Sequence, residues 1–443
     1  YLIIIMEYCH ARLPEAHTKW REVSIKELSQ TVTSGSRDWS KYYSLEGSKF
    51  IRMTNLNRYG IHLLLDELKF VSLPDNGSEG ERTSLKENDI LVSITAELGK
   101  IGIIPKGFGK AYINQHTALV RPNNKIPAKF LAYNLSTGVS NKKLNRLNDS
   151  GAKSALNLGT LRNFKIFRPE GSDGIQEQQK IAQFLTTVDT KIEQLTKKQT
   201  LLEQYKKGIS QKLFRPSNSL LPNGNSPCNP EIRFRPKGIS SQAQGKDDDG
   251  QEYPDWVEKK LRDVAERVTK KNKENNKNVL TISAQQGLVI QEQYFTKSVS
   301  AKDVTGYYLL NRNDFAYNKS YSKGYPMGAI KRLTKYPKGV VSTLYICFRI
   351  KKDNVSFFEQ FFNDGNINRE LHKIAQEGAR NHGLLNMSVI EFFNDIMLSI
   401  PSLPEQQKIA NFLSSIDSKI TQVSKQLDQT KQFKKALLQQ MFV

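Results

Sequence analysis

Two stretches of this chain are near copies of one another, and this duplication constrains the fold more than any other feature of the sequence. Residues 177–214 read EQQKIAQFLTTVDTKIEQLTKKQTLLEQYKKGISQKLF, and residues 405–442 read EQQKIANFLSSIDSKITQVSKQLDQTKQFKKALLQQMF. The two stretches align without a gap, and 18 of the 38 positions are identical. Most of the other differences are conservative. The match indicates an internal duplication.

Both copies carry apolar residues at steps of three and four, the spacing that places side chains along one side of a helix. We therefore expect a central coiled-coil helix over 175–214 and a C-terminal one over 403–443. A helix of 38 residues extends about 57 Å at 1.5 Å per residue. Each apolar seam requires a partner, so the two helices are expected to pack against each other antiparallel. The predicted seam consists of Ile181, Leu185, Val188, Ile192, Leu195, Leu202, Ile409, Leu413, Ile416, Ile420, Val423 and Leu427.

The start of the second helix carries its own signal. Ser402-Leu-Pro-Glu405 has the spacing of a capping box, in which the serine hydroxyl and the glutamate carboxylate satisfy backbone N–H groups reciprocally. The sequence therefore predicts a capped helix start at this point.

Weaker matches ahead of each helix extend the duplication to a globular domain. The matching pairs are Trp20 with Trp256, Asn88-Asp89-Ile90 with Asn313-Asp314-Phe315, and Gly151-Ala152-Lys153 with Gly378-Ala379-Arg380. Each domain shows short β-type runs between glycine-rich turns, such as 90–94 and 340–346. Helical stretches follow near 128–137 and 355–363. Each globular domain is thus predicted to be mixed α/β.

The predicted fold class is therefore α/β (α+β), with two similar globular domains separated by two long antiparallel coiled-coil helices. Antiparallel helices would relate the domains by a pseudo-two-fold axis. Residues 215–252 are rich in proline and glycine, which is typical of a linker. The predicted order is an N-terminal extension (1–16), a first domain (17–170), the central helix (175–214), the linker (215–252), a second domain (253–402) and the C-terminal helix (403–443).

The charge of the chain indicates a polyanionic partner. Lys and Arg number 66 against 44 Asp and Glu, which gives a net charge of +22. A folded protein this basic usually contacts nucleic acid, because each phosphate contact releases counterions. Residues 98–148 and 315–352 contain no Asp or Glu, and each window holds nine Lys or Arg. The predicted DNA-binding residues are Lys100, Lys106, Lys110, Arg121, Lys142, Lys143, Lys153, Asn318, Lys319, Tyr321, Lys323, Tyr325, Lys331, Arg332, Arg369 and Arg380.

The loop at 318–325 is the most suggestive part of these windows. It reads NKSYSKGY, so amide, lysine and tyrosine side chains stand close together. Amide and lysine groups can read base edges in the major groove, and Gly324 would let the backbone approach DNA closely. An ordinary hairpin tip on a solvated basic face remains an equally open interpretation of the same residues.

No pattern in the sequence indicates catalysis or a metal site. There is no phosphate-binding loop, dinucleotide fingerprint or zinc spacing, and carboxylates are sparse where positive charge gathers. His116 and His382 have no evident partner. The three cysteines, Cys9, Cys228 and Cys347, are scattered, which excludes a disulfide framework and suits a reducing cytoplasm. Nothing approaches 18 consecutive apolar residues, so we expect no membrane span.

Two related α/β domains, each followed by a helix that begins EQQKIA and continues FL and D-x-K-I, resemble the specificity (S) subunit of type I restriction–modification systems. The resemblance covers nearly the whole chain, and the paired segments 177–192 and 405–420 are its most specific parts. The first helix departs from the pattern at 171–174, where Gly-Ser-Asp-Gly replaces the compact Leu-Pro-Glu entry of the second.

The resemblance implies that each domain is a target recognition domain that reads one half of a split, asymmetric sequence in double-stranded DNA. The helices would set the spacer and dock two methyltransferase (modification) subunits, which bind S-adenosylmethionine and methylate adenine at N6. Restriction subunits that use ATP and Mg²⁺ would join some complexes. The chain itself would be non-catalytic and bind no cofactor. The alternative is a coiled-coil architectural protein that bridges DNA without enzymatic partners.

Overall fold

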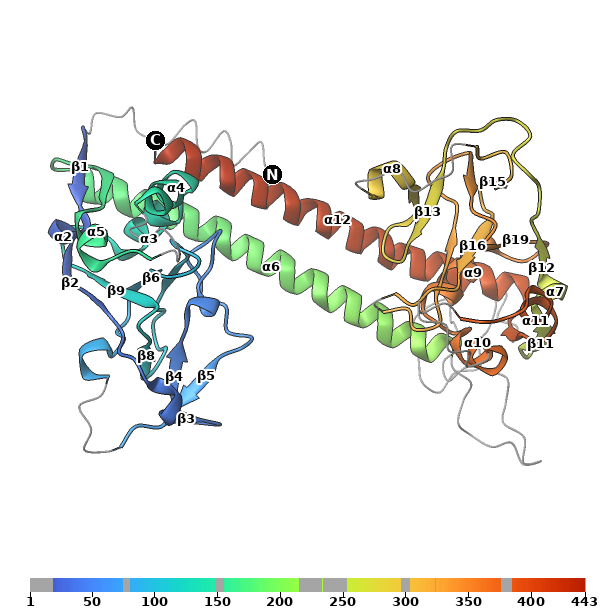
Figure 1. Cartoon of the computed structure of the whole chain (residues 1–443), viewed down its shortest axis with the longest axis horizontal. Helices are drawn as coiled ribbons and strands as arrows, with labels where there is room; N and C mark the ends of the chain where they lie inside the picture. The colour runs from blue at the N-terminus through green and yellow to red at the C-terminus, as the bar shows by residue number, and fades with distance from the viewer. Residues whose placement is uncertain are drawn as a thin grey trace. The chain divides into compact units, whose positions relative to one another are not determined.

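The computed structural model describes residues 19–74, 80–147, 155–214, 233, 253–295, 303–322, 324–375 and 385–442. The chain divides into two compact units. Unit 1 contains the residues up to Thr196 together with those from Lys425 onward, and unit 2 is Lys197–Ser424. Each unit therefore combines a globular part with a segment of both long helices, α6 (Gly174–Phe214) and α12 (Leu403–Met441) (Figure 1).

An ion pair joins α6 to α12 in each unit. In unit 1, Nζ of Lys434 lies 2.6 Å from Oδ1 of Asp189. In unit 2, Nζ of Lys206 lies 2.7 Å from Oδ1 of Asp417. The residue number increases along α6 from Asp189 to Lys206, while that of the paired residue on α12 decreases from Lys434 to Asp417. The two helices are therefore antiparallel, as the duplicated seam predicts.

The end portions of the seam pack into the cores of the globular parts. In unit 1 the start of α6 and the end of α12 join the same cluster as the sheet and helix α3, and in unit 2 the start of α12 and the end of α6 do likewise. Most of the predicted seam residues are buried, while Ile192, Leu202 and Ile420 are partly buried. The ends of the two helices are thus part of the globular cores, while Leu195, Val423 and Leu427 in the middle of the pair are buried outside both clusters.

Each unit contains a four-stranded sheet with the same connectivity. The order in unit 1 is β2 (Ser29–Ser34), β9 (Thr117–Pro122), β6 (Ile90–Ser93) and β7 (Ile101–Ile103). The order in unit 2 is β12 (Ala265–Arg267), β19 (Ile346–Ile350), β16 (Phe315–Asn318) and β17 (Ala329–Arg332). A two-stranded ribbon accompanies each sheet, formed by β1 (Trp20–Ser24) with β10 (Lys165–Pro169) and by β11 (Val257–Lys260) with β20 (Met397–Ile400).

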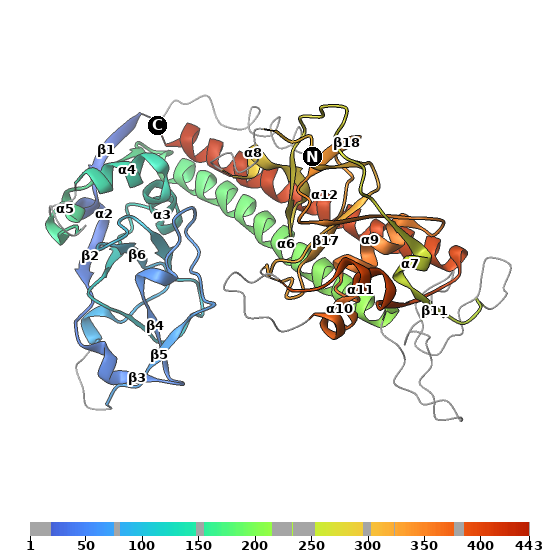
Figure 2. The same cartoon turned by 45° about the vertical axis from the view of Figure 1, so that its right-hand side comes forward.

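The short helices also recur in the same order (Figure 2). Unit 1 has α2 (Ile25–Leu28), α3 (Ala128–Ser136), α4 (Gly138–Arg146) and α5 (Leu158–Asn163). Unit 2 has α7 (Leu261–Val264), α9 (Val355–Asn363), α10 (Asn368–Ile374) and α11 (Val389–Asn394). The helices predicted near 128–137 and 355–363 are confirmed, as is the mixed α/β class.

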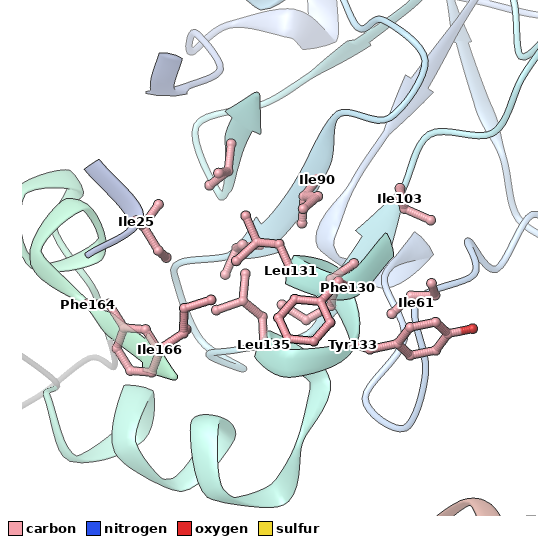
Figure 3. Close-up of a cluster of buried hydrophobic side chains, with 14 of the residues drawn as sticks. Ile25, Ile61, Ile90, Ile103, Phe130, Leu131, Tyr133, Leu135, Phe164 and Ile166 are labelled. Carbon is pink, nitrogen blue, oxygen red and sulfur yellow. The ribbon is translucent and has the colours of Figure 1, made fainter. Parts of the chain in front are cut away.

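Helix α3 supplies the centre of the unit 1 core. Phe130, Leu131, Tyr133 and Leu135 are fully buried, because three faces of this short helix meet the sheet, α6 and α12. Figure 3 shows these side chains among isoleucines of the neighbouring elements, with Tyr133 at one edge of the cluster. The polar end of Tyr133 therefore needs a hydrogen-bond partner, which α6 provides through Asp189 at 2.8 Å.

The remaining strands differ between the units. Unit 1 has a second four-stranded sheet, in the order β3 (Tyr43–Ser44), β5 (Lys69–Val71), β4 (Ser48–Ile51) and β8 (Ala111–Ile113). Unit 2 has two ribbons instead, β13 (Leu280–Ser283) with β14 (Gly287–Ile290) and β15 (Tyr308–Asn311) with β18 (Lys338–Val341), and a short helix α8 (Gln291–Tyr294). The duplicated frame thus carries unlike additions.

The repeated Asn-Asp dipeptide has a structural explanation. Asn88 adopts a left-handed backbone conformation (φ 68°). The carboxylate of Asp89 accepts a hydrogen bond from the backbone N–H of Lys86, three residues earlier, and a bidentate pair from Arg121, all at 2.7 Å. In unit 2, Asp314 pairs with Arg349 in the same way, at 2.7 and 3.1 Å. Both aspartates are buried, so each needs its arginine.

One predicted strand is wrong in its extent. The run 340–346 was expected to be continuous, but it contains the end of β18 and the start of β19 with a turn between them. The N–H of Tyr345 donates to the carbonyl of Ser342 at 3.2 Å, which closes that turn. The apolar residues before and after this turn belong to strands of different sheets. A single apolar run in the sequence therefore covers two strands and the turn that joins them.

The predicted capping box at the start of α12 is also wrong. The hydroxyl of Ser402 is buried without a hydrogen-bond partner, and the carboxylate of Glu405 binds Arg233 at 2.7 and 3.1 Å. Arg233 lies in the predicted linker, of which it is the one described residue. A distant arginine thus replaces the local serine as the partner of this fully buried glutamate.

We predict that Lys434→Met destabilises the protein by about 3–5 kcal/mol, because it leaves the buried carboxylate of Asp189 without its cation. Chemical denaturation would measure the loss. The matched control is Lys338→Met, which removes a half-exposed partner of Glu274 and should cost less than about 1 kcal/mol. Equal effects of the two variants would contradict a structural role for the buried pair.

We further predict that Asp189→Asn reduces the loss of stability in acid. Burial opposes ionisation of Asp189, but hydrogen bonds from His62 and attraction by Lys434 outweigh burial and lower its pKa below the usual 3.8. A lowered pKa stabilises the folded state above the usual value, and this contribution disappears as the pH falls below 3.8. Unfolding of both proteins, measured from about pH 4.5 to 2, should therefore show the smaller decline for the variant. Parallel declines would contradict the assignment.

Candidate nucleic-acid interface

The hairpins β6–β7 and β16–β17 occupy equivalent places in the two shared sheets. Their tips span residues 94–100 in unit 1 and 319–328 in unit 2. A neighbouring segment holds each tip at its first residue, because Leu156 donates to the carbonyl of Ile94 at 2.9 Å and Leu385 donates to that of Lys319 at 3.1 Å. The suggestive loop of the sequence is therefore the tip of the longer of two related hairpins.

The longer hairpin is fastened on its inner side. The hydroxyl of Tyr317 donates to the carbonyl of Met327 at 2.8 Å. The ammonium group of Lys331 donates to the hydroxyl of Tyr325 at 2.9 Å and to Oδ1 of Asn363 at 2.7 Å. Tyr321, by contrast, is 66% exposed at the tip. The hairpin thus presents one tyrosine outward on a framework that its other residues hold in place.

The shorter hairpin carries a carboxylate at its tip. Glu97 binds Nζ of Lys100 at 2.6 Å and a guanidinium nitrogen of Arg58 at 3.1 Å. Hydrogen bonds from Lys100 and then Arg58 lower the pKa of Glu97. One carboxylate therefore holds two cations together at this hairpin, and the cluster has a net positive charge.

Arg58 belongs to a loop that the sequence did not single out. The loop runs from Asn57 to His62, beside strand β7, and Tyr59 in it is 82% exposed. A search for basic windows without Asp or Glu does not detect this loop, because it contains a single arginine and acidic residues lie close to it in sequence. The loop is recognised only once Glu97 brings Arg58 and Lys100 together.

Besides Lys100, which pairs with Glu97, three of the predicted DNA-binding cations bind groups within their own unit. Arg121 pairs with Asp89, and Lys331 is buried against Tyr325. Arg332 binds Glu359 at 2.9 Å and also donates to Asn313. Their positive groups already have partners inside the fold, and contact with DNA by these three residues stays a prediction.

The other predicted residues fall into three groups. Lys100 binds Glu97, Asn318 accepts a hydrogen bond from the backbone of Ser320 at 3.1 Å, and Lys319 is half-buried. Lys153, Lys323 and Arg380 lie outside the described residues, as do the Gly-Ala motifs that precede Lys153 and Arg380. Besides Tyr321, the exposed residues are the cations Lys106, Lys110, Lys142, Lys143 and Arg369.

The structure gives His116 and Cys347 internal roles. Nδ1 of His116 lies 2.8 Å from the hydroxyl of Thr95, and its Nε2 lies 3.1 Å from the amide nitrogen of Gln115. Burial raises the pKa of Cys347 to about 12, so its thiol is protonated at neutral pH. Within the described part of the chain, no three His, Cys, Asp or Glu residues cluster as metal ligands, and no helix has the length and hydropathy to cross a bilayer.

Comparison with known proteins places this architecture in a family. The family model for the type I restriction modification DNA specificity domain matches residues 18–204 and 253–431. The S subunit of the type I restriction-modification system from M. genitalium superposes with a TM-score of 0.55 at 14% sequence identity, over 98% of each chain, which shows a shared fold. The HsdS subunit from Thermoanaerobacter tengcongensis matches with a TM-score of 0.44 at 13% identity, over 97% of each chain. With both of its globular parts matched, this chain belongs to the type I restriction modification DNA specificity domain family and is a DNA specificity subunit of a type I restriction–modification system.

Proposed function

We propose that the two units of this specificity subunit read separate halves of one bipartite, asymmetric DNA site. The observation that carries the proposal is the duplicated frame with unlike additions. Equivalent sheets and helices present equivalent surfaces, while different outer strands present different side chains. Two related but unlike readers suit two unlike half-sites.

The antiparallel pair of α6 and α12 would set the number of unread base pairs between the half-sites. Ion pairs in both units fix the register of these helices. A continuous helix of about 40 residues has a defined length of roughly 60 Å. A helix pair of fixed length favours one number of unread base pairs over slightly larger or smaller numbers.

The chain would act with two methyltransferase subunits, docked on the helices, that supply S-adenosylmethionine and methylate adenine at N6. Restriction subunits using ATP and Mg²⁺ would join where the host encodes them. The chain itself would contribute recognition without catalysis, bind no cofactor, and work in the cytoplasm, where the DNA is. The family match favours this function over an architectural protein that bridges DNA without enzymatic partners.

The direct test maps methylated adenines by single-molecule sequencing in cells that carry the gene with its methyltransferase partner. A bipartite motif that is methylated only when the gene is present is the expected result. Methylation that is unchanged by deletion of the gene would contradict the function. Co-purification of two methyltransferase subunits per chain distinguishes the proposal from the architectural alternative, which expects self-assembly or a monomer.

We predict that replacing residues 253–402 by the corresponding domain of another family member changes one half of the methylated motif and leaves the other half intact. The reason is that unit 1 keeps its own sheets and loops. Methylome sequencing of cells with the hybrid measures the outcome. A change in both halves would contradict independent reading, provided that the hybrid still binds the methyltransferase subunits.

We also predict that lengthening both helices by one heptad increases the preferred spacer. The insertions belong after Lys198 in α6 and after Ser424 in α12, so that both ion pairs keep their partners. Seven helical residues add about 10 Å, which corresponds to about three base pairs. Binding to duplexes with spacers lengthened by one to five base pairs would measure the shift, and an insertion in α6 alone serves as the mismatched control. If the preferred spacer is unchanged, the length of the helices does not set it.

A further inference from the structure

Both shared sheets display an exposed tyrosine at the same end, although the tyrosines come from different segments. In unit 2, Tyr321 belongs to the β16–β17 tip itself and is 66% exposed. In unit 1 the β6–β7 tip is short, and the adjoining loop supplies Tyr59, which is 82% exposed. The two tyrosines occupy different segments of the duplicated frame, so they do not descend from one tyrosine of the ancestral repeat.

The exposure of Tyr59 is not the result of a loose loop. Asn57 exchanges two backbone hydrogen bonds with Ile101, both of 2.9 Å, and Ile103 donates to the carbonyl of Ile61 at 2.8 Å. Between these anchors, the N–H of Tyr59 donates to Oδ1 of Asn57 at 2.9 Å. The backbone on both sides is therefore tied to β7, while the aromatic ring projects into solvent.

The same loop is attached to the helix pair. Nζ of Lys434 donates to the carbonyl of Tyr59 at 3.4 Å while it binds Asp189. Nε2 of His62 lies 3.3 Å from Oδ2 of Asp189, which also accepts from Tyr133. The buried carboxylate therefore fixes the loop with respect to both helices and α3. A side chain presented in this way is preorganised for binding.

The charge next to Tyr59 suits an anionic partner. Arg58 and Lys100 share the single carboxylate of Glu97. The combined charge of the three groups is positive, and the side chain of Arg58 is 37% exposed. An aromatic ring beside cations matches double-stranded DNA, because cations bind phosphates while a tyrosine can contact the sugar–phosphate backbone or the base edges in a groove.

We propose that Tyr59, together with Arg58 and Lys100, forms the DNA contact of unit 1 and that it corresponds to Tyr321 and Lys319 in unit 2. The ligand is one half-site of double-stranded DNA. This assignment rests on the proposed function, since it presumes that unit 1 reads DNA. It adds Tyr59 and Arg58 to the residues that determine binding, and it gives Asp189 and Lys434 the role of positioning residues.

The test uses the full chain assembled with its methyltransferase subunits, and duplexes that carry the methylated motif with base-pair changes in one half at a time. Tyr59→Ala should weaken binding about tenfold, and it should reduce discrimination in one half of the motif only. Arg58→Ala should lower affinity and reduce the slope of log affinity against log salt by about one. Tyr321→Ala should reduce discrimination in the opposite half.

Two variants control for the general properties of the side chain. Tyr43→Ala removes another exposed tyrosine of unit 1, 48% exposed and away from this loop on β3, and should change affinity less than about twofold. Tyr59→Phe keeps the ring and should retain most of the affinity. Thermal unfolding should be unchanged in Tyr59→Ala, because the ring is exposed.

Three outcomes would overturn the assignment. If the wild-type complex selects its motif and Tyr59→Ala behaves like Tyr43→Ala, the loop is not the DNA contact, although the proposed function stands. If Tyr59→Ala lowers the recovery of methyltransferase subunits while the assembled complex binds DNA normally, the loop is a protein-docking surface. If the wild-type complex shows no motif preference, the proposed function fails, and this assignment fails with it.

Discussion

A lysine–aspartate pair that crosses between two helices is the contact on which each unit depends. A buried carboxylate is strongly destabilising unless a cation and hydrogen-bond donors satisfy it. In unit 1, the buried Asp189 takes its cation from α12 and a hydroxyl from α3. In unit 2, Asp417 has a side chain that is 42% exposed, and it takes its cation from α6 and the amide of Gln360 from α9. Each aspartate therefore joins both long helices to the globular part. A change in the register of the two helices would therefore also disturb the packing of the helices against the globular cores.

The duplicated frame and the unlike additions divide the structure into a support that both units share and two surfaces that differ between them. The support includes the Asp89–Arg121 and Asp314–Arg349 pairs, which hold a turn against a neighbouring strand in both units. The surfaces that differ include hairpin tips of different length and chemistry. In unit 2 the long tip carries its own lysine and tyrosine. In unit 1 the short tip carries Glu97, and a second loop contributes the tyrosine.

The sequence was sufficient for the architecture because the repeat and its seam are local, periodic features. It was insufficient for the interface, because the order of charged residues in the sequence does not show which of them pair with one another in the folded protein. Arg121 lies in a window without acidic residues, yet its partner Asp89 lies immediately before β6, the strand that pairs with its own strand β9. Lys331 has no acidic neighbour in sequence, yet it is buried against Tyr325. Tyr59 was overlooked for the opposite reason, since its significance depends on residues about forty positions away.

The composition of the unit 1 core has a consequence for how the protein is made. Leu437, Leu438 and Phe442 of α12 are buried in that core, and the ring of Phe442 lies 5.2 Å from that of Phe130. These residues leave the ribosome long after the sheet they cover. Contacts so distant in sequence form slowly and leave apolar surface uncovered in the meantime. The part of the protein that is translated first is thus completed last, which makes its early, open form the stage at which aggregation competes with folding.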